Sequence, residues 1–184
     1  MIKIKFGTDG WRAIIAREYT VDNVQRVAAG TAAWMKQSGM KTVVVGHDCR
    51  FGGEMFLKAI TEVFCFHGIK VLYGKGFVST PMVSLGVVKL KADLGIVITA
   101  SHNPPSYNGY KLKSHFGGPS SPADITSVEN LIPDEWNTTT ATFEDYVQQN
   151  MAQEVPLEDI YVNHAESCFD LDLIRNSGLK IAYD

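Results

Sequence analysis

The chain has 184 residues, of which 45% are hydrophobic and 20% are charged, and its formal net charge is −3. These are ordinary values for a globular protein, and the length suits one domain of about 100–200 residues. The small negative charge provides no general basic field, which argues against a nucleic-acid partner. The apolar runs fall far short of the ~20 residues that a membrane-spanning helix needs, so we expect no membrane partner.

The cysteines and the first residues bear on the compartment. The three cysteines are widely spaced and form no C-x-x-C pair, which favours reduced thiols over a disulfide or zinc framework. The opening residues, MIKIK, are too polar for a secretory signal peptide. We therefore expect a cytoplasmic protein.

Along the chain, helical and strand patterns alternate. Thr20 has the features of a helix N-cap, and Thr80 before Pro81 matches an N-cap followed by proline at the first helical position. Strands separated by helices of this length imply crossover connections and helices on both faces of a sheet. The sequence thus predicts an α/β fold, a three-layer α/β/α arrangement with a mixed, largely parallel sheet. The expected elements are a helix over 21–35, a strand over 41–46, a helix over 54–67, a strand over 69–73, a helix from 80, a strand over 94–98, a returning strand over 110–113, a short helix from 121 and a helical region over 142–177.

The most informative segment follows the apolar strand predicted at 94–98. Ser101 lies at the exit of this strand, where its side chain is free to face a ligand. Asn103 precedes two prolines, which bias the backbone to extended conformations and stiffen the loop. Asn108-Gly109 is predicted to form a tight turn into the returning strand, which would make that strand antiparallel.

Three collinear motifs in this chain resemble those of a known family. TASHNPP at residues 99–105, followed by NGYK at 108–111, is similar to the phosphoserine loop of the α-D-phosphohexomutases. FGTDGWR at 6–12 and GHDCR at 46–50 agree with the same family in order and kind, and STP at 79–81 is a weaker match. The resemblance covers roughly the first 130 residues well, and the rest more loosely.

Members of that family have four domains, of which the second carries a metal loop of the pattern DGDxDR. This chain has no such triplet, and DLD at 170–172 lacks the glycine and the third acid. The resemblance therefore implies an N-terminal fragment. We expect residues 1–141 to be the phosphoserine-bearing α/β/α domain I, residues 142–177 a helical linker region, and residues 178–184 the truncated first strand of domain II.

The resemblance also implies an activity. Family members interconvert hexose 1-phosphate and hexose 6-phosphate, of glucose or mannose here, through a phosphoserine and a bisphosphorylated sugar. Ser101 would carry the phosphate, and one Mg²⁺ would bind through that phosphate, with its remaining ligands absent from this chain. The implied roles are general acid/base for Lys111, catalytic roles for Arg12 and His102, and substrate or phosphate binding for Thr8, Asn103 and Asn108. The partner would be a hexose phosphate, and the fragment alone is expected to be inactive.

Some of these residues also have a plainer structural interpretation, which the sequence leaves open. His102 could serve only to hydrogen-bond the loop, because adjacent side chains on an extended backbone point in opposite directions. Lys111 and Lys113 share a face of the expected strand and could form a solvated edge. Asp48 and Arg50 are interpreted as an internal ion pair.

Three alternatives to a glucose or mannose mutase stay open. A serine hydrolase would pair Ser101 with His102, although adjacent residues rarely reach the required geometry and no G-x-S-x-G motif is present. The chain could instead be a non-catalytic module that binds phosphate or phosphosugars, or part of a phosphoglucosamine mutase. In addition, an unpaired strand at 179–184 would favour self-association of the fragment.

Overall fold

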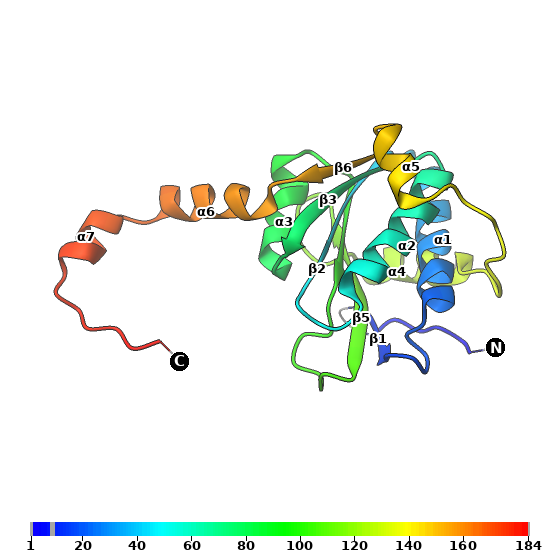
Figure 1. Cartoon of the computed structure of the whole chain (residues 1–184), viewed down its shortest axis with the longest axis horizontal. Coiled ribbons are helices and arrows are strands. Elements are labelled where there is room, and N and C mark those ends of the chain that lie inside the picture. Colours follow the sequence, from blue (N-terminus) through cyan, green and yellow to red (C-terminus); the bar gives the residue numbers. More distant parts are fainter. Residues whose placement is uncertain (1, 8–9, 184) are drawn as a thin grey trace.

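A computed structural model describes residues 2–7 and 10–183 of the chain (Figure 1). In this part, a six-stranded sheet has the strand order β1-β5-β4-β2-β3-β6. Strands β4, β2, β3 and β6 run parallel to one another, whereas β5 is antiparallel to both β4 and β1. The strands are β1 (Trp11–Ile14), β2 (Thr42–His47), β3 (Lys70–Phe77), β4 (Leu94–Ile98), β5 (Tyr107–Ser114) and β6 (Ala152–Val155).

Helices cover both faces of this sheet. One face is covered by α1, α2, α4 and α5, and the other by α3 and the beginning of α6 (Figure 1). The predicted α/β fold with a mixed, largely parallel sheet is thereby confirmed. The helices are α1 (Val21–Gln37), α2 (Gly53–Phe66), α3 (Thr80–Lys89), α4 (Pro122–Leu131), α5 (Phe143–Gln148), α6 (Leu157–Cys168) and α7 (Leu171–Asn176).

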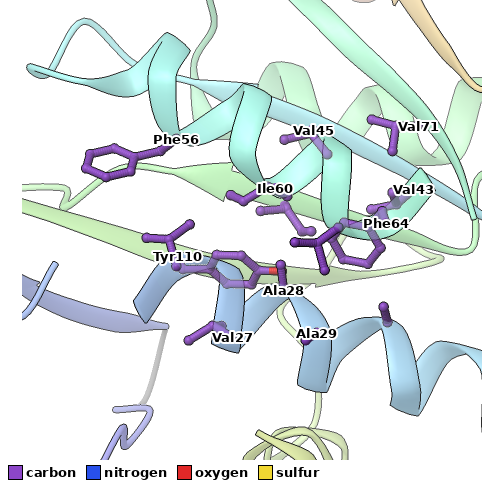
Figure 2. Close-up of a cluster of buried hydrophobic side chains, with 14 of the residues drawn as sticks. Val27, Ala28, Ala29, Val43, Val45, Phe56, Ile60, Phe64, Val71 and Tyr110 are labelled. Carbon is purple, nitrogen blue, oxygen red and sulfur yellow. The ribbon is translucent and has the colours of Figure 1, made fainter. Parts of the chain in front are cut away.

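The larger core lies between the sheet and helices α1 and α2 (Figure 2). Small side chains of α1, Ala28 and Ala29, let that helix approach closely, and Ile60 and Phe64 of α2 fill the space above the sheet. Burial of each such large side chain contributes about 1.5–3 kcal/mol. Tyr110 of β5 reaches into this core and donates its hydroxyl hydrogen bond to Thr31 Oγ1 at 3.3 Å. The strand that follows the serine motif is therefore anchored in the larger hydrophobic core.

Helix starts follow the sequence closely, with one shift. Thr20 caps α1, since its side chain accepts a hydrogen bond from Asn23 N at 3.3 Å. Ser121 caps α4 by the same geometry. The expected cap at Thr80 is wrong by one residue, because Ser79 accepts from Met82 N at 3.4 Å and Thr80 is already helical.

The expected tight turn at Asn108-Gly109 is wrong. Both residues lie inside β5, and Gly109 is paired with Arg12 of β1. The chain reverses earlier, through one turn in which Asn103 N donates to Ala100 O at 3.0 Å and another in which Tyr107 N donates to Pro104 O at 2.9 Å. The glycine serves close packing instead, since a Cβ at Gly109 would lie 2.6 Å from the carbonyl oxygen of Thr99.

The C-terminal part differs from the expected helical region. Residues 152–155 form strand β6, which pairs with β3 in parallel, so the helical prediction for 142–177 is wrong there. Beyond it, α6 and α7 extend away from the body of the molecule (Figure 1). The described residues 178–183 form no strand in this chain and are exposed, and their assignment to the first strand of domain II stays a prediction. No helix among the described residues is long and apolar enough to cross a membrane.

Candidate active site at the serine loop

The loop that joins β4 to β5 carries the serine motif, and we call residues 99–107, which comprise this loop and the first residue of β5, the serine loop. Its first turn is stabilised by the Ser101 backbone N–H, which donates to Thr99 Oγ1 at 3.1 Å. The two successive turns make the loop compact, and its beginning and end are fixed by the antiparallel pairing of β4 with β5. The carboxyl end of a parallel strand is a common position for ligand sites in α/β sheets.

Ser101 stands at the tip of the first turn, exposed, in a left-handed backbone conformation with φ of +55°. The left-handed conformation costs a residue that has a Cβ on the order of 1 kcal/mol. Such strain persists only where neighbouring groups fix the backbone. Non-glycine residues in this conformation cluster at active sites. The backbone geometry therefore agrees with the functional role predicted for Ser101.

Arg12 approaches the serine loop from β1. Its Nη1 donates to Asn103 Oδ1 at 3.3 Å, so the structure brings two of the predicted site residues together. Its Nε is buried and finds no hydrogen-bond partner among the described residues. Among the described residues only Nη1 of Arg12 is hydrogen-bonded, so donors for an anionic group remain at the end of its guanidinium, whereas the buried Nε is out of reach of a ligand.

Lys111 lies in β5, opposite Val97 of β4, and is only 5% exposed. Lys113 is 6% exposed, so the alternative of a solvated lysine edge is wrong for both residues. Strand alternation places Tyr110 and Leu112 in the α1–α2 core and the two lysines on the other face of the sheet. A buried lysine beside the serine loop is compatible with a proton-transfer role, and that role stays a prediction.

Asn108 has no exposed surface. Its Nδ2 donates to the carbonyl oxygen of Phe51 at 3.3 Å, and its Oδ1 accepts from Gly109 N at 2.8 Å. Asn108 therefore supports the loop, and its expected contact with substrate stays a prediction. Asn103 is half-buried, and Arg12 already occupies its side-chain oxygen.

The two remaining predicted residues differ in what the structure shows. His102 is exposed in the turn beside Ser101. Its catalytic role stays a prediction. Thr8 lies outside the described residues.

Tyr19 supports the strand below the site. It is fully buried, it stacks on Trp11 with ring centroids 4.8 Å apart, and its hydroxyl donates to the Gly109 carbonyl at 2.8 Å. Burial raises the pKa of Tyr19 well above its ordinary value, and the charges of ionised Tyr110 and Asp48 would add to this effect. The Tyr19 phenol therefore stays protonated at neutral pH and keeps donating this hydrogen bond to the Gly109 carbonyl.

Asp48 and Arg50 follow β2, and they form the expected ion pair, with 3.5 Å between Asp48 Oδ2 and Arg50 Nε. The same guanidinium also contacts the serine loop, which the sequence interpretation missed. The available signal was the GHDCR string, which is one of the three collinear motifs. A partner in space cannot be identified from that string alone.

A mixed sheet with helices on both faces, and an exposed serine on a compact loop beyond a parallel strand, define an α/β/α domain with a serine-centred site. The family description "Phosphoglucomutase/phosphomannomutase, alpha/beta/alpha domain I" matches residues 3–138. Because this match covers most of the chain, the chain belongs to the phosphoglucomutase/phosphomannomutase family. The resemblance inferred from the motifs is confirmed.

Individual relatives agree with this assignment. A phosphoglucosamine/phosphogalactosamine mutase of Sulfurisphaera tokodaii is 31% identical over 183 residues, which are 97% of this chain and 38% of that protein. A phosphoglucomutase of Komagataeibacter xylinus is 27% identical and matches 99% of this chain and 36% of its own length. A crystal structure assigned as a phosphomannomutase of Thermus thermophilus is 35% identical, has a TM-score of 0.85, and covers 94% of this chain and 38% of that chain. The chain thus spans well under half the length of these relatives.

Proposed function

We propose that this chain is the N-terminal part of a phosphohexomutase that interconverts hexose 1-phosphate and hexose 6-phosphate, with Ser101 as the residue that carries the transferred phosphate. The observation that carries the proposal is Ser101 itself, exposed and left-handed on a loop that Arg12 contacts, within a family domain named for such mutases. For the domain division, the sheet and its cores extend past the expected boundary at residue 141, so we propose that domain I continues through β6 to Leu157 and that residues 178–184 begin a second domain.

The proposed step moves a phosphoryl group and one proton. The bond between Ser101 Oγ and phosphorus breaks as a sugar hydroxyl oxygen bonds to phosphorus. The sugar hydroxyl gives up its proton, for which Lys111 is the proposed acceptor, and the departing Ser101 Oγ takes up one proton in its place. The resulting sugar bisphosphate then returns its other phosphoryl group to Ser101, which completes the interconversion. Such transfer depends on positioning and on neutralising charge, and the planar fork of Arg12 suits an equatorial phosphate oxygen.

The identity of the sugar is a finer part of the proposal. Glucose or mannose phosphate is the first candidate, because the residues after Asn103-Pro104 resemble the glucose and mannose members of the family more than the glucosamine members. A second candidate is glucosamine phosphate, because relatives at 31–32% identity bear the name phosphoglucosamine mutase. A panel of the three hexose 1-phosphates, assayed with the full-length protein and a bisphosphate primer, should show the highest kcat/KM for glucose or mannose. A higher kcat/KM for glucosamine 1-phosphate would instead favour the second candidate.

A test of the central proposal is the substitution Ser101→Ala in the full-length protein. We expect mass spectrometry of the wild-type protein to find a phosphate on Ser101, and we expect the variant to lose at least about a thousandfold in kcat. Ser106→Ala, at an exposed serine of the same loop, is the matched control and should keep its activity. A fully active Ser101→Ala variant would exclude the proposal.

The serine hydrolase alternative finds no support in the loop geometry. In the described part of the chain, the hydrogen bonds of Ser101 involve its backbone N–H and carbonyl, and none joins its hydroxyl to His102. A fluorophosphonate probe should leave Ser101 unlabelled. The alternative of a non-catalytic phosphate-binding module predicts a full-length protein that binds hexose phosphates without turnover.

For the metal, we propose that a phosphate oxygen on Ser101 supplies one ligand of Mg²⁺. No group of three His, Cys, Asp or Glu side chains among residues 2–7 and 10–183 is arranged to hold a metal ion, so these residues alone do not form a Mg²⁺ site. The other ligands that octahedral Mg²⁺ needs would then come from groups beyond these described residues, water included. Calorimetry on the 184-residue chain should accordingly show no micromolar affinity for Mg²⁺, and such an affinity would contradict this assignment.

The compartment is also part of the proposal. The three cysteines are free, and two of them, Cys49 and Cys168, are exposed. We propose a cytoplasmic protein, because exposed thiols persist in a reducing compartment. Fractionation of the source cells tests this location.

A further inference from the structure

The side chain of Arg50 contacts the serine loop, and the family resemblance gave this residue no role. It comes from the segment between β2 and α2, far before the loop in sequence, and its side chain is only 14% exposed. The backbones of the two segments also meet, since Asp48 N donates to the carbonyl oxygen of Ile98 at 3.1 Å. The exit of β2 therefore lies beside the exit of β4.

The guanidinium of Arg50 binds the serine loop through four backbone carbonyls. Nη2 donates to the carbonyl oxygens of Ser101 at 2.8 Å and Asn103 at 2.7 Å. Nη1 donates to those of Pro104 at 2.8 Å and Tyr107 at 3.0 Å. These bonds engage both turns of the loop, and the first of them fixes the carbonyl of the left-handed serine itself.

Asp48 orients this guanidinium. Its Oδ2 lies 3.5 Å from Nε, and its Oδ1 accepts a hydrogen bond from the Arg50 backbone N–H at 2.9 Å. An arginine has five N–H donors in a fixed planar fork. Four of them are bonded to the loop and the fifth faces Asp48, so no donor of Arg50 is left for a substrate phosphate.

We propose that Arg50 is a positioning residue that holds the serine loop in its productive conformation, so that Ser101 Oγ is aimed at the reacting group. Arg50 touches no substrate atom and acts only through the loop backbone. A lysine cannot replace it, because one ammonium has three donors at a single point and cannot span four carbonyls. The effect on turnover rests on the proposed mutase activity, whereas the effect on the loop does not.

The test compares Arg50→Lys and Arg50→Ala with the control Arg17→Lys in the full-length protein. Arg17 is a surface arginine whose side chain is 70% exposed and pairs only weakly with Glu18, at 3.9 Å. A misplacement of about 1 Å at a reacting group costs on the order of a hundredfold in rate. We expect kcat to fall by about that factor in both Arg50 variants, with KM for the sugar phosphate within about threefold, and no change in the control.

Two further readouts separate positioning from general support of the fold. Hydrogen exchange should speed up in the peptide that spans 99–109 in Arg50→Lys, while β2 and β3 keep their protection. Added guanidinium ion at low millimolar concentration should restore at least about tenfold of the lost kcat in Arg50→Ala, and Arg50→Lys should not respond. If Arg50→Ala does not fold, the exchange and kinetics of Arg50→Lys decide.

Three results would overturn the inference: wild-type kcat in Arg50→Lys, an effect confined to KM, or unchanged exchange in the serine loop. A wild-type full-length protein without mutase activity would refute the proposed function instead. The exchange measurement would still decide whether Arg50 holds the loop, because it requires no turnover.

Discussion

Gly109 lies where β5 passes close to the backbone of β1 and to that of Thr99, the residue that follows β4. A methyl group at this position would meet the carbonyl oxygens of Thr99 at 2.6 Å and Trp11 at 2.9 Å. Backbone atoms of paired strands cannot move aside as a flexible side chain can. A single hydrogen atom at this position is therefore part of what lets the serine loop return into the sheet.

The first prediction concerns the substitution Gly109→Ala. We expect the free energy of unfolding to fall by about 1–3 kcal/mol, as for other overpacked positions. Urea denaturation of the chain measures this change. Gly7→Ala is the matched control. Among the described residues, a Cβ at Gly7 would meet only Gly10 O, at 3.6 Å, so this substitution should change stability by about 0.5 kcal/mol or less. Equal effects of the two substitutions would show that the close approach at Gly109 is not what matters.

Cys65 of α2 gives a prediction about pH. Burial raises the pKa of its thiol from the ordinary 9.0 to about 12, against a smaller opposing effect of a hydrogen bond with the Val71 backbone. Between these values the unfolded chain loses the thiol proton and the folded chain keeps it, so stability falls as pH rises from about 9. One proton contributes at most about 1.4 kcal/mol per pH unit.

The measurement is the free energy of unfolding at about pH 8 to 10 for the wild type, Cys65→Ala and Cys49→Ala. We expect the loss of stability between about pH 9 and pH 10 to be smaller in Cys65→Ala than in the wild type. Cys49 is exposed, so its replacement should leave the slope unchanged. The same slope in all three proteins would show that the Cys65 thiol does not contribute.

At the scale of elements, α6 is attached to the body chiefly through Leu157, with Ile160 partly buried beside it. Leu157 is 1% exposed, whereas no other residue of this helix is buried. Its methyl groups occupy the space left by two glycines, Gly74 of β3 and Gly86 of α3, at 2.9 Å and 2.5 Å from where their Cβ atoms would lie. The helix is therefore held at its first turn, and its remainder extends from the body (Figure 1).

Leu157→Ala should therefore cost about 2–4 kcal/mol in the free energy of unfolding and increase hydrogen exchange in α6. The substitution would leave a cavity between Gly74 and Gly86, and glycines have no side chain that could fill it. Val162→Ala, at a position of the same helix that is 43% exposed, should change stability by about 0.5 kcal/mol or less. If exchange in α6 stays at its wild-type rate, the helix has another attachment.

The elements that the sequence predicts well are those with a local physical signal. The apolar runs of β2 and β4 and the N-caps Thr20 and Ser121 each carry their information within a few residues. The edge strands β1 and β6 were not predicted, because each has four residues and only one neighbour in the sheet. Asn108-Gly109 was interpreted as a turn because the reason for its glycine, a close approach of other strands, is not local.

The residues of the candidate site divide in the same way, into those that a local motif predicts and those whose contacts are not local in sequence. Ser101 and the serine loop follow from a contiguous motif, and the proximity of Arg12 to Asn103 agrees with the family resemblance. The burial of Lys113 and the hydrogen bonds from Arg50 to the loop depend on which strand ends meet in space. No spacing along the chain encodes that meeting, so these features required the structure.

At the scale of the whole molecule, the last part of the chain is unlike the rest. The first core lies within residues 4–152, and the second extends to Leu157, with Ile160 packed against it. None of the described residues from 168 to 183 is buried. Several of them are large and apolar, including Leu173 and Ile181. Exposed apolar side chains on an unpaired segment favour association with other molecules.

The final prediction concerns deletion of residues 179–184 from the 184-residue chain. We expect an unchanged Tm, because Leu179, Ile181 and Tyr183 are 74%, 79% and 99% exposed and contribute nothing to either core. We also propose that this segment mediates self-association of the chain, since an extended segment offers unsatisfied backbone donors and acceptors beside its apolar side chains. Sedimentation velocity at increasing concentration should then show association in the intact chain and monomers after the deletion.

A Tm lowered by more than about 4 °C would correspond to roughly 1 kcal/mol or more, and would place the segment inside the folded domain. Association that persists after the deletion would assign it to another surface, of which the exposed face of α7 is the nearest in sequence.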